Sequence, residues 1–283
     1  MPRIAYVNGA YAPLREAFVH VEDRGYQFAD GIYEVALRVA GRFWDLDGHL
    51  ARWTRSLKEL DIAAPMSERA LRLVINRLIA KNRLEDCYIY MQATRGVAPR
   101  NHPFPLEGVR PSLVMTVKPL DMRKLNANAV KGVSVITEPD IRWGRVDIKS
   151  VGLLPNILAK EKAKRMGSAE AWLVRKGRVT EGGSSNAWII DKDGALITHP
   201  LGQEILGGIT RDTVMKCAQE LQLRVIERAF SVDEAKNAKE AFITSAMNLV
   251  TPVIAIDGAK VGDGKPGATA LRLRQSYVER NSG

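Results

Sequence analysis

The sequence predicts a protein of mixed α and β structure in two domains. Segments with the period of a helix alternate with segments of strand period along the whole chain. At 283 residues, the chain has the length of one large domain or two of ordinary size. Both periods are lost at 120–130, which we interpret as a linker between a smaller N-terminal α/β domain, 1–119, and a larger C-terminal domain, 131–283.

The N-terminal domain is expected to contain two helices among its strands. Apolar residues recur at helical spacing over 46–60, and Ser67 can cap a second helix whose apolar side chains again share one face. The residues of the two faces are Leu46, Leu50, Trp53, Leu57 and Leu60, then Leu71, Val74, Ile75, Leu78 and Ile79. Strands are expected at 32–40, 87–94 and 112–117.

The C-terminal domain is expected to continue the alternation of strands and helices. Strands are predicted near 132–137, 170–175 and 186–191, and helices near 154–166, from the glycines at 207–208 to Leu221, and over 268–277. The segment GDGKPG, 262–267, lacks the spacing of a phosphate-binding loop, so we predict a hairpin turn there.

Composition excludes several classes of protein. With 46% hydrophobic and 26% charged residues, the chain is typical of soluble globular proteins. The longest uncharged stretch, 241–256, is too short and polar to span a membrane, and we expect no signal peptide at the N-terminus. The net charge of +10 is spread along the chain, which makes nucleic acid a weak candidate partner. Cys87 and Cys217 are not in a CxxC pair, which favours a reducing, cytoplasmic setting.

Lys149 is the first candidate for chemistry. It lies between apolar Ile148 and Val151, just before a predicted helix. A lysine in apolar surroundings tends to lose its proton and to act as a nucleophile, as Schiff-base chemistry requires. The alternative is a surface lysine with a buried stem, and the spacing alone favours that alternative.

Four further segments are rich in hydrogen-bond donors. A turn at 179–190 combines glycines, serines and Asn186 with the carboxylate of Glu181. LGGITRDT, 206–213, opens a helix whose first amides suit a phosphate, and ITSAMN, 243–248, is another turn of small residues. In ATRGVAPRNH, 93–102, Arg100 and His102 can bind a carboxylate together, or they are ordinary loop charges.

Taken together, these segments resemble the fold-type IV aminotransferases, which depend on pyridoxal 5′-phosphate (PLP), and within them the D-amino-acid aminotransferases. The resemblance covers nearly the whole chain. Its strongest stretches are EDRGYQFADGIYEV (22–35), TRGVAPRNH (94–102), DIRWGRVDIKS (140–150), TEGGSSN (180–186), GGITRD (207–212) and TPVIAIDG (251–258). It implies a C-terminal domain with a barrel-like β core, and PLP in the cleft between the domains.

The resemblance also implies roles for individual residues toward the cofactor. Lys149 would be the Schiff-base lysine and the proton shuttle, and Glu181 would pair with the pyridine nitrogen. The groups expected to hold the phosphate or the ring are Arg52, Ile209, Thr210, Ser245 and Ala246 for the phosphate and Leu206 for the ring. No metal site is expected.

For the substrate, the resemblance implies a trap for the α-carboxylate made by Tyr33, Arg100 and His102, the last two from the partner subunit of a homodimer. This RxH pair is the mark of the D-specific enzymes. The expected reaction is transamination of D-alanine with 2-oxoglutarate to give pyruvate and D-glutamate. The alternatives are an (R)-amine or branched-chain L-amino-acid transaminase, or an aminodeoxychorismate lyase, of the same fold. A rival from another class is a non-enzymatic basic binding protein.

Overall fold

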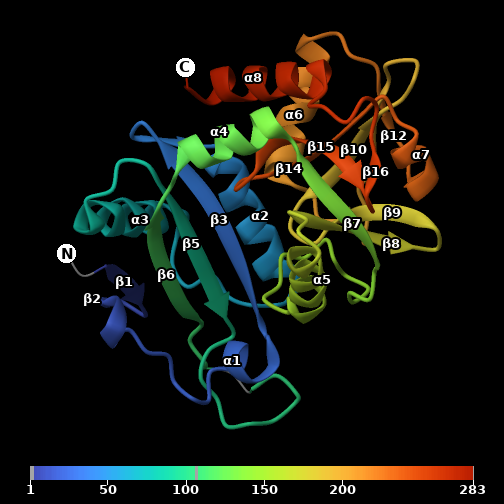
Figure 1. Ribbon diagram of the computed structural model, residues 1–283. Helices are drawn as coiled ribbons and strands as arrows, with labels where there is room; N and C mark the ends of the chain where they lie inside the picture. The colour runs from blue at the N-terminus through green and yellow to red at the C-terminus, as the bar shows by residue number, and fades with distance from the viewer. Residues whose placement is uncertain (1–2, 106–107, 283) are drawn as a thin grey trace. The chain divides into compact units, whose positions relative to one another are not determined.

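A computed structural model describes residues 3–105 and 108–282, which divide into two compact units (Figure 1). The first unit comprises Met1–Leu120 together with Ile148–Gly152. The second comprises Asp121–Asp147 together with Leu153–Gly283. The chain therefore leaves the first unit after residue 120 and returns to it briefly at 148–152, a return that the sequence did not predict.

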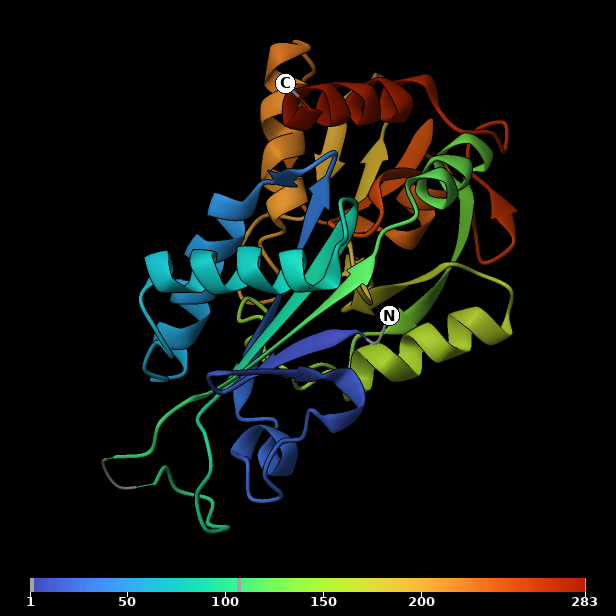
Figure 2. The same cartoon turned by 90° about the vertical axis from the view of Figure 1, so that its left-hand side faces the viewer.

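The first unit is built on an antiparallel sheet with helices α2 and α3 packed against it. Among the described residues, the strand order is β2-β1-β6-β5-β3-β4, and Figure 2 shows α3 lying across the strands beside α2. The elements are β1 (Ile4–Val7), β2 (Ala10–Pro13), the 3-10 helix Leu14–Glu16, α1 (Arg24–Phe28), β3 (Gly31–Val39), β4 (Arg42–Trp44), α2 (Leu46–Glu59), α3 (Glu68–Asn82), β5 (Cys87–Thr94) and β6 (Ser112–Pro119).

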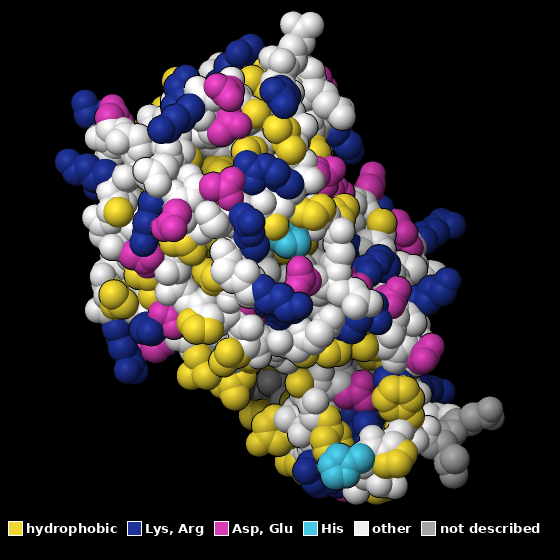
Figure 3. All heavy atoms as spheres, turned by 90° about the vertical axis from the view of Figure 1, so that its right-hand side faces the viewer, with side chains coloured by type: hydrophobic (Ala, Val, Ile, Leu, Met, Phe, Trp, Pro, Cys, Tyr) yellow, Lys and Arg dark blue, Asp and Glu magenta, His cyan; other side chains and the backbone are white. Residues whose placement is uncertain are grey.

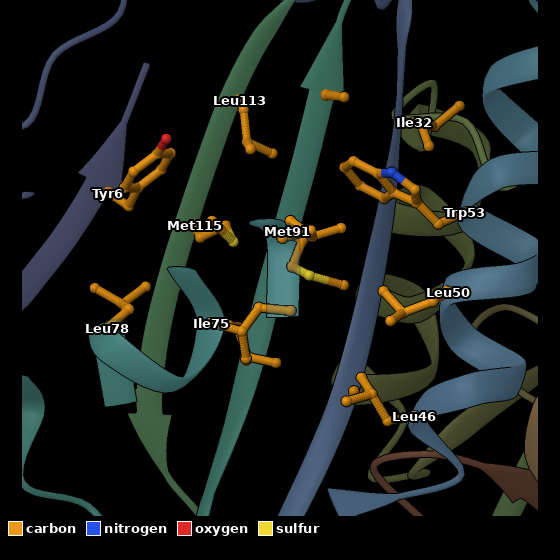
Figure 4. Close-up of a cluster of buried hydrophobic side chains, with 14 of the residues drawn as sticks. Tyr6, Ile32, Leu46, Leu50, Trp53, Ile75, Leu78, Met91, Leu113 and Met115 are labelled. Atoms are coloured by element: carbon orange, nitrogen blue, oxygen red, sulfur yellow. The ribbon is translucent and has the colours of Figure 1, made fainter. Parts of the chain in front are cut away.

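Alternation along β3 decides which side chains are buried under the helices. Ile32, Glu34 and Ala36 are fully buried on the face that α2 covers, whereas Tyr33 points to the opposite face and is partly exposed. The apolar core under α2 and α3 includes Ile32, Leu46, Leu50, Trp53, Ile75, Leu78, Met91, Leu113 and Met115 (Figure 4). Tyr33 is thus not part of this apolar core and lies on the other face of β3.

The second unit is built on a larger mixed sheet. Its strand order among the described residues is β12-β11-β10-β14-β15-β7-β8-β9-β13, with β16 paired to β15, and it curls as an open half-barrel, so the predicted barrel-like core is present in open form. The elements are α4 (Met122–Lys131), β7 (Val133–Pro139), α5 (Leu154–Arg165), β8 (Glu170–Arg175), β9 (Arg178–Gly182), β10 (Asn186–Ile190), β11 (Leu196–Thr198), α6 (Ile209–Glu220), β12 (Val225–Glu227), β13 (Phe230–Ser231), α7 (Val232–Lys236), β14 (Glu240–Ser245), β15 (Leu249–Ile256), β16 (Ala259–Lys260) and α8 (Ala268–Ser282).

The segment expected to be an irregular linker, 120–130, is helical instead. Helix α4 occupies Met122–Lys131, and the side chain of Asp121 caps it by accepting from the Lys124 amide at 3.1 Å. Only Ala129 of this helix is fully buried, although Met122, Leu125 and Ala129 recur at helical spacing. The prediction failed here because this apolar stripe is short and is interrupted by two asparagines, which are weak helix formers.

The hairpin turn predicted at 262–267 also lies elsewhere. Strands β15 and β16 are joined by Asp257 and Gly258, both with positive φ, in a two-residue turn. GDGKPG follows β16 and forms the loop that leads into α8. The Asp-Gly pair is the stronger signal for a two-residue hairpin, because that turn requires positive φ at both central positions.

The basic charge is dispersed on the face that Figure 3 shows. On the face shown in Figure 3, Lys and Arg side chains are scattered and interspersed with acidic ones, and they form no continuous basic stripe. Among the described residues, none of the helices is long and apolar enough to cross a membrane. Cys87 and Cys217 are buried free thiols, as expected.

Candidate functional site

Lys149 and Tyr33 lie side by side in the first unit. The segment 148–152 runs along the start of β3, where the Tyr33 amide donates to the Lys149 carbonyl at 3.0 Å and Ile32 forms a bridge with Ser150. The Lys149 Nζ lies 4.2 Å from the centroid of the Tyr33 ring. Lys149 is half-buried, and none of the described carboxylates of the first unit forms an ion pair with its amine. The amine therefore lies against an aromatic ring, and none of the described acidic side chains of this unit pairs with it.

Tyr90 supports Tyr33 from the neighbouring strand, and sequence reasoning assigned no role to it. The two rings stack with their centroids 5.7 Å apart, and the Tyr90 hydroxyl donates to Gln92 Oε1 at 2.6 Å. Burial, together with the nearby Tyr33, raises the pKa of Tyr90 to about 12. Tyr90 is consequently a neutral phenol at any working pH.

Arg52, the predicted phosphate ligand, is part of a buried ionic cluster between α2 and β3. Its Nε and Nη2 donate to the two oxygens of Glu34 at 2.6 and 2.9 Å, and His49 Nδ1 lies 2.8 Å from Glu34 Oε2. Burial alone would raise the pKa of Glu34, but the charge and hydrogen bonds of Arg52 and the contact with His49 outweigh it and lower the pKa to about 2. This two-point pair fixes the plane of the Arg52 guanidinium.

Glu34 is expected to make the stability of the first unit sensitive to acid. Its pKa of about 2 in the fold, against 4.5 for a free glutamate, corresponds to about 3 kcal/mol near neutral pH. Because the folded pKa is the lower one, this stabilisation is present above pH 4.5 and is lost as the pH falls toward 2. In urea unfolding, Glu34→Gln should be less stable near neutral pH, and the difference should shrink steadily in acid. A difference that stays constant down to about pH 3 would contradict this.

Arg100 and His102 come together on one aromatic ring of the first unit. The Arg100 guanidinium carbon lies 4.5 Å from the centroid of Phe28, and the His102 ring centroid lies 5.5 Å from it. Both side chains are exposed. The two side chains of the predicted RxH pair thus lie against the same ring on the surface of this unit.

Glu181 is the centre of the polar network in the second unit. It lies at the end of β9, and its Oε2 accepts from Asn186 Nδ2 at 2.8 Å and from the Leu206 amide at 3.1 Å. Its Oε1 accepts from Arg142 Nη1 at 2.5 Å. The predicted residues Glu181 and Leu206 are therefore in direct contact, and both carboxylate oxygens of Glu181 are oriented.

Arg142 stands between two buried carboxylates, and sequence reasoning assigned no role to it. Besides Glu181, it binds Asp140 through Nε and Nη2, each at 2.9 Å. Burial opposes ionisation of Asp140, but the hydrogen bonds and charge of Arg142 and a bond from Thr180 lower its pKa to about 2. The same carboxylates raise the pKa of Arg142 against the effect of its burial. The local signal for this pair is the Asp-x-Arg spacing in DIRWGRVDIKS, which does not reveal that both side chains are buried.

The predicted phosphate residues of the second unit meet around Asn186. Ile209 and Thr210 begin α6 after Gly208, and a Cβ on Gly208 would lie 2.0 Å from Asn186 Oδ1. Asn186 also pairs with Thr244 on the neighbouring strand β14, directly before Ser245 and Ala246. The start of α6 therefore adjoins the side chain of Asn186, and the end of β14 pairs with the main chain of the same residue. A helix N-terminus offers unsatisfied amides and a positive dipole, which fit a phosphate.

The chain as a whole is similar to known aminotransferases. The chain matches the family model "Amino-transferase class IV" over residues 31–256. It is 40% identical over 280 residues to a D-alanine aminotransferase of Staphylococcus haemolyticus, with 98% of each chain covered. It is 42% identical over 278 residues to a D-alanine aminotransferase of Listeria monocytogenes, covering 96% of this chain and 94% of the relative.

Among solved structures, the chain is similar to a branched-chain amino acid aminotransferase of Thermobaculum terrenum determined in its PLP form. The identity is 25% and the TM-score 0.85, with 99% of this chain and 94% of the other chain covered. The predicted fold type and cofactor are those of the matched family, and the chain belongs to the class IV aminotransferases, which are PLP-dependent enzymes.

Proposed function

We propose that the chain is a transaminase that moves the amino group between D-amino acids and 2-oxo acids, with D-alanine and 2-oxoglutarate giving pyruvate and D-glutamate. The observation that carries the proposal is the pairing of Arg100 and His102 on the Phe28 ring. An arginine and a histidine that lie on the same ring can both donate hydrogen bonds to one substrate carboxylate. The high identity to D-alanine aminotransferases over nearly the whole chain supports the same substrate class.

Bound PLP would supply an aldehyde that condenses with amines and a ring that accepts the electron pair left by a departing α-proton. Lys149 would be the covalent attachment point. Once the substrate amine has displaced it, the free Lys149 amine would carry the proton between the substrate Cα and the cofactor C4′. Its position beside Tyr33, without an acidic partner in its own unit, suits an amine that must change its protonation state.

The remaining predicted residues would bind and orient the cofactor. Glu181, held by Arg142 and Asn186, would keep a proton on the pyridine nitrogen. Arg52 would bind the phosphate. The amides of Ile209, Thr210 and Ala246 and the hydroxyl of Ser245 would also hold the phosphate, and Leu206 would pack against the ring.

Tyr33, Arg100 and His102 would bind the substrate carboxylate, with Arg100 and His102 contributed by the partner subunit of a homodimer in the cytoplasm. The segments around these two residues carry exposed apolar side chains that suit burial in a subunit interface: Phe18, Val21, Tyr26, Val97 and Phe104. A carboxylate fixed on this side determines which face of the substrate loses its α-proton. That choice of face would give selectivity for the D-enantiomer.

Enantiomer preference tests the proposal most directly. The yellow PLP form should lose its visible absorbance within one half-reaction when D-alanine is added, and L-leucine at equal concentration should leave it largely unchanged. The solved structures that resemble this chain at 24–28% identity include several branched-chain aminotransferases, so preference for L-leucine is the competing outcome. Bleaching by L-leucine alone, or only by an (R)-amine, would reject the assignment to D-amino acids.

A further inference from the structure

Two buried arginines share one carboxylate beneath the loop that carries Arg100 and His102. Arg24 opens α1 and is 3% exposed, and Arg95 follows β5 and is 8% exposed. Arg24 Nε and Arg95 Nε both donate to Asp30 Oδ2, at 2.7 and 2.8 Å, and Arg95 Nη2 donates to Asp30 Oδ1 at 3.0 Å. One carboxylate thus faces two buried guanidinium groups, and the remaining donors require other acceptors.

Those acceptors are backbone carbonyls of two loops. Arg24 donates through Nη1 to the Asn101 carbonyl at 2.6 Å and through Nη2 to the His102 carbonyl at 3.2 Å, with the Pro103 carbonyl 3.4 Å from Nη1. Arg95 instead donates to the carbonyls of 60 and 61. Hydrogen bonds from a charged donor are among the strongest in proteins. Arg24 therefore holds the main chain of the loop between Arg100 and Phe104, whereas Arg95 contacts this loop at the Phe104 side chain, whose ring centroid is 3.5 Å from its guanidinium carbon.

The other end of α1 contacts the side chains of the same loop. Phe28 is the ring on which both Arg100 and His102 lie, and the Arg24 guanidinium carbon is 4.8 Å from its centroid. Helix α1 is itself fixed to β5, because Asp23 accepts from the Gly25 amide at 2.9 Å and from the Thr94 hydroxyl at 3.0 Å. One short helix thus orients the backbone and the side chains of the RxH pair.

We propose that Arg24 and Phe28 are positioning residues of the substrate-carboxylate site. Arg24 sets the backbone of 101–103 and Phe28 sets the two side chains, so that Arg100 and His102 present their donors in one direction. This inference rests on the proposed function, since it takes Arg100 and His102 as the groups that bind the carboxylate. It assigns to α1 an effect on substrate affinity, with the proton-transfer step left unchanged.

Arg24→Leu is the main variant, and it is compared with Arg24→Lys, Phe28→Leu and the exposed control Arg15→Leu. The first measurement is limited trypsin cleavage after Arg100 in the PLP-loaded enzyme, followed by mass spectrometry, which does not depend on activity. The second is the D-alanine half-reaction, followed at the PLP absorbance, which separates apparent Kd from limiting rate.

Arg24→Leu should accelerate cleavage after Arg100 at least about tenfold and raise the apparent Kd for D-alanine about 10- to 100-fold, with PLP retained. The limiting rate should stay within about threefold. Arg24→Lys should restore part of both effects, because an ammonium can donate to the carbonyls without the planar fork. Phe28→Leu should raise Kd while leaving cleavage nearly unchanged, and Arg15→Leu should alter neither quantity.

The two measurements separate failure of this inference from failure of the proposed function. Unchanged cleavage and unchanged Kd in Arg24→Leu would overturn the inference. Faster cleavage with unchanged Kd would mean that Arg24 holds the loop but that the loop does not bind the carboxylate, which overturns both. If Arg24→Leu does not fold, Phe28→Leu decides, and an unaltered Kd there overturns the inference.

Discussion

Replacing Lys149 with alanine is expected to lower the transamination rate by at least about 10³-fold, because the variant would lose both the proposed attachment point of the cofactor and the proposed proton carrier. Borohydride reduction of the native enzyme should fix the cofactor covalently on the tryptic peptide that contains Lys149. Lys149→Arg retains a positive charge beside Tyr33 but cannot perform either task, so it should be as inactive as the alanine variant.

A matched control separates loss of chemistry from loss of fold. Lys58 is an exposed lysine in the last turn of α2, and Lys58→Ala should retain full turnover. The unfolding midpoint of Lys149→Ala should remain close to that of the native chain, since Lys149 is only half-buried. Full turnover of Lys149→Ala, or covalent cofactor on another lysine, would reject the assignment.

Arg142→Leu should produce the largest loss of stability, about 3–5 kcal/mol near neutral pH, because it removes the cation shared by two buried carboxylates, Glu181 and Asp140, and leaves Asp140 with only the longer ion pair to Arg175 at 3.3 Å. Asp140 has a pKa of about 2 in the native fold, below the ordinary 3.8, so its stabilisation is present above that value and is lost in stronger acid. Without Arg142, burial should raise the pKa of Asp140 from its native value of about 2, because it is then opposed only by Arg175 at 3.3 Å and by the Thr180 hydroxyl, and the deficit of the variant should grow as the pH rises.

The deficit of Arg142→Leu should therefore shrink when urea unfolding is repeated near pH 4. Asp140→Asn combined with Arg142→Leu should recover part of the loss, since one of the two buried charges that Arg142 compensates is removed. Arg145→Leu is the control in the same loop: Arg145 is about one-third exposed and pairs with Asp147, so about 1 kcal/mol or less is expected. A deficit independent of pH would mean that the loss is one of packing alone.

Periodicity predicted the elements that bury a continuous apolar face. Helix α2 was expected at 46–60 and lies at Leu46–Glu59, and α3 begins after Ser67 with the predicted cap. Helix α4 was missed because its apolar stripe is short and is interrupted by asparagines, and β1 and β2 were missed because strands of four residues carry too little pattern.

In the candidate site, too, some residues could be predicted from the sequence and others could not. The resemblance assigned Lys149 and Glu181 their roles because both lie within distinctive motifs. The supporting residues could not be assigned in this way: Glu34, Arg24 and Arg142 act through partners that are chosen by the tertiary fold. A buried arginine is indistinguishable from a surface arginine in the sequence, since its type is the same and only its neighbours in space differ.

The return of residues 148–152 to the first unit has a consequence for dissecting the protein. Lys149 belongs by its contacts to one unit, yet the segments on both sides of 148–152 belong to the other. Neither unit can be produced as one uninterrupted fragment: a chain of 1–120 lacks the lysine, and a chain of 121–283 carries it without the strand that holds it. The chain passes from one unit to the other three times, after residue 120 and on either side of 148–152. The amine of Lys149 therefore reaches its position beside Tyr33 only when both segments of the first unit have folded together.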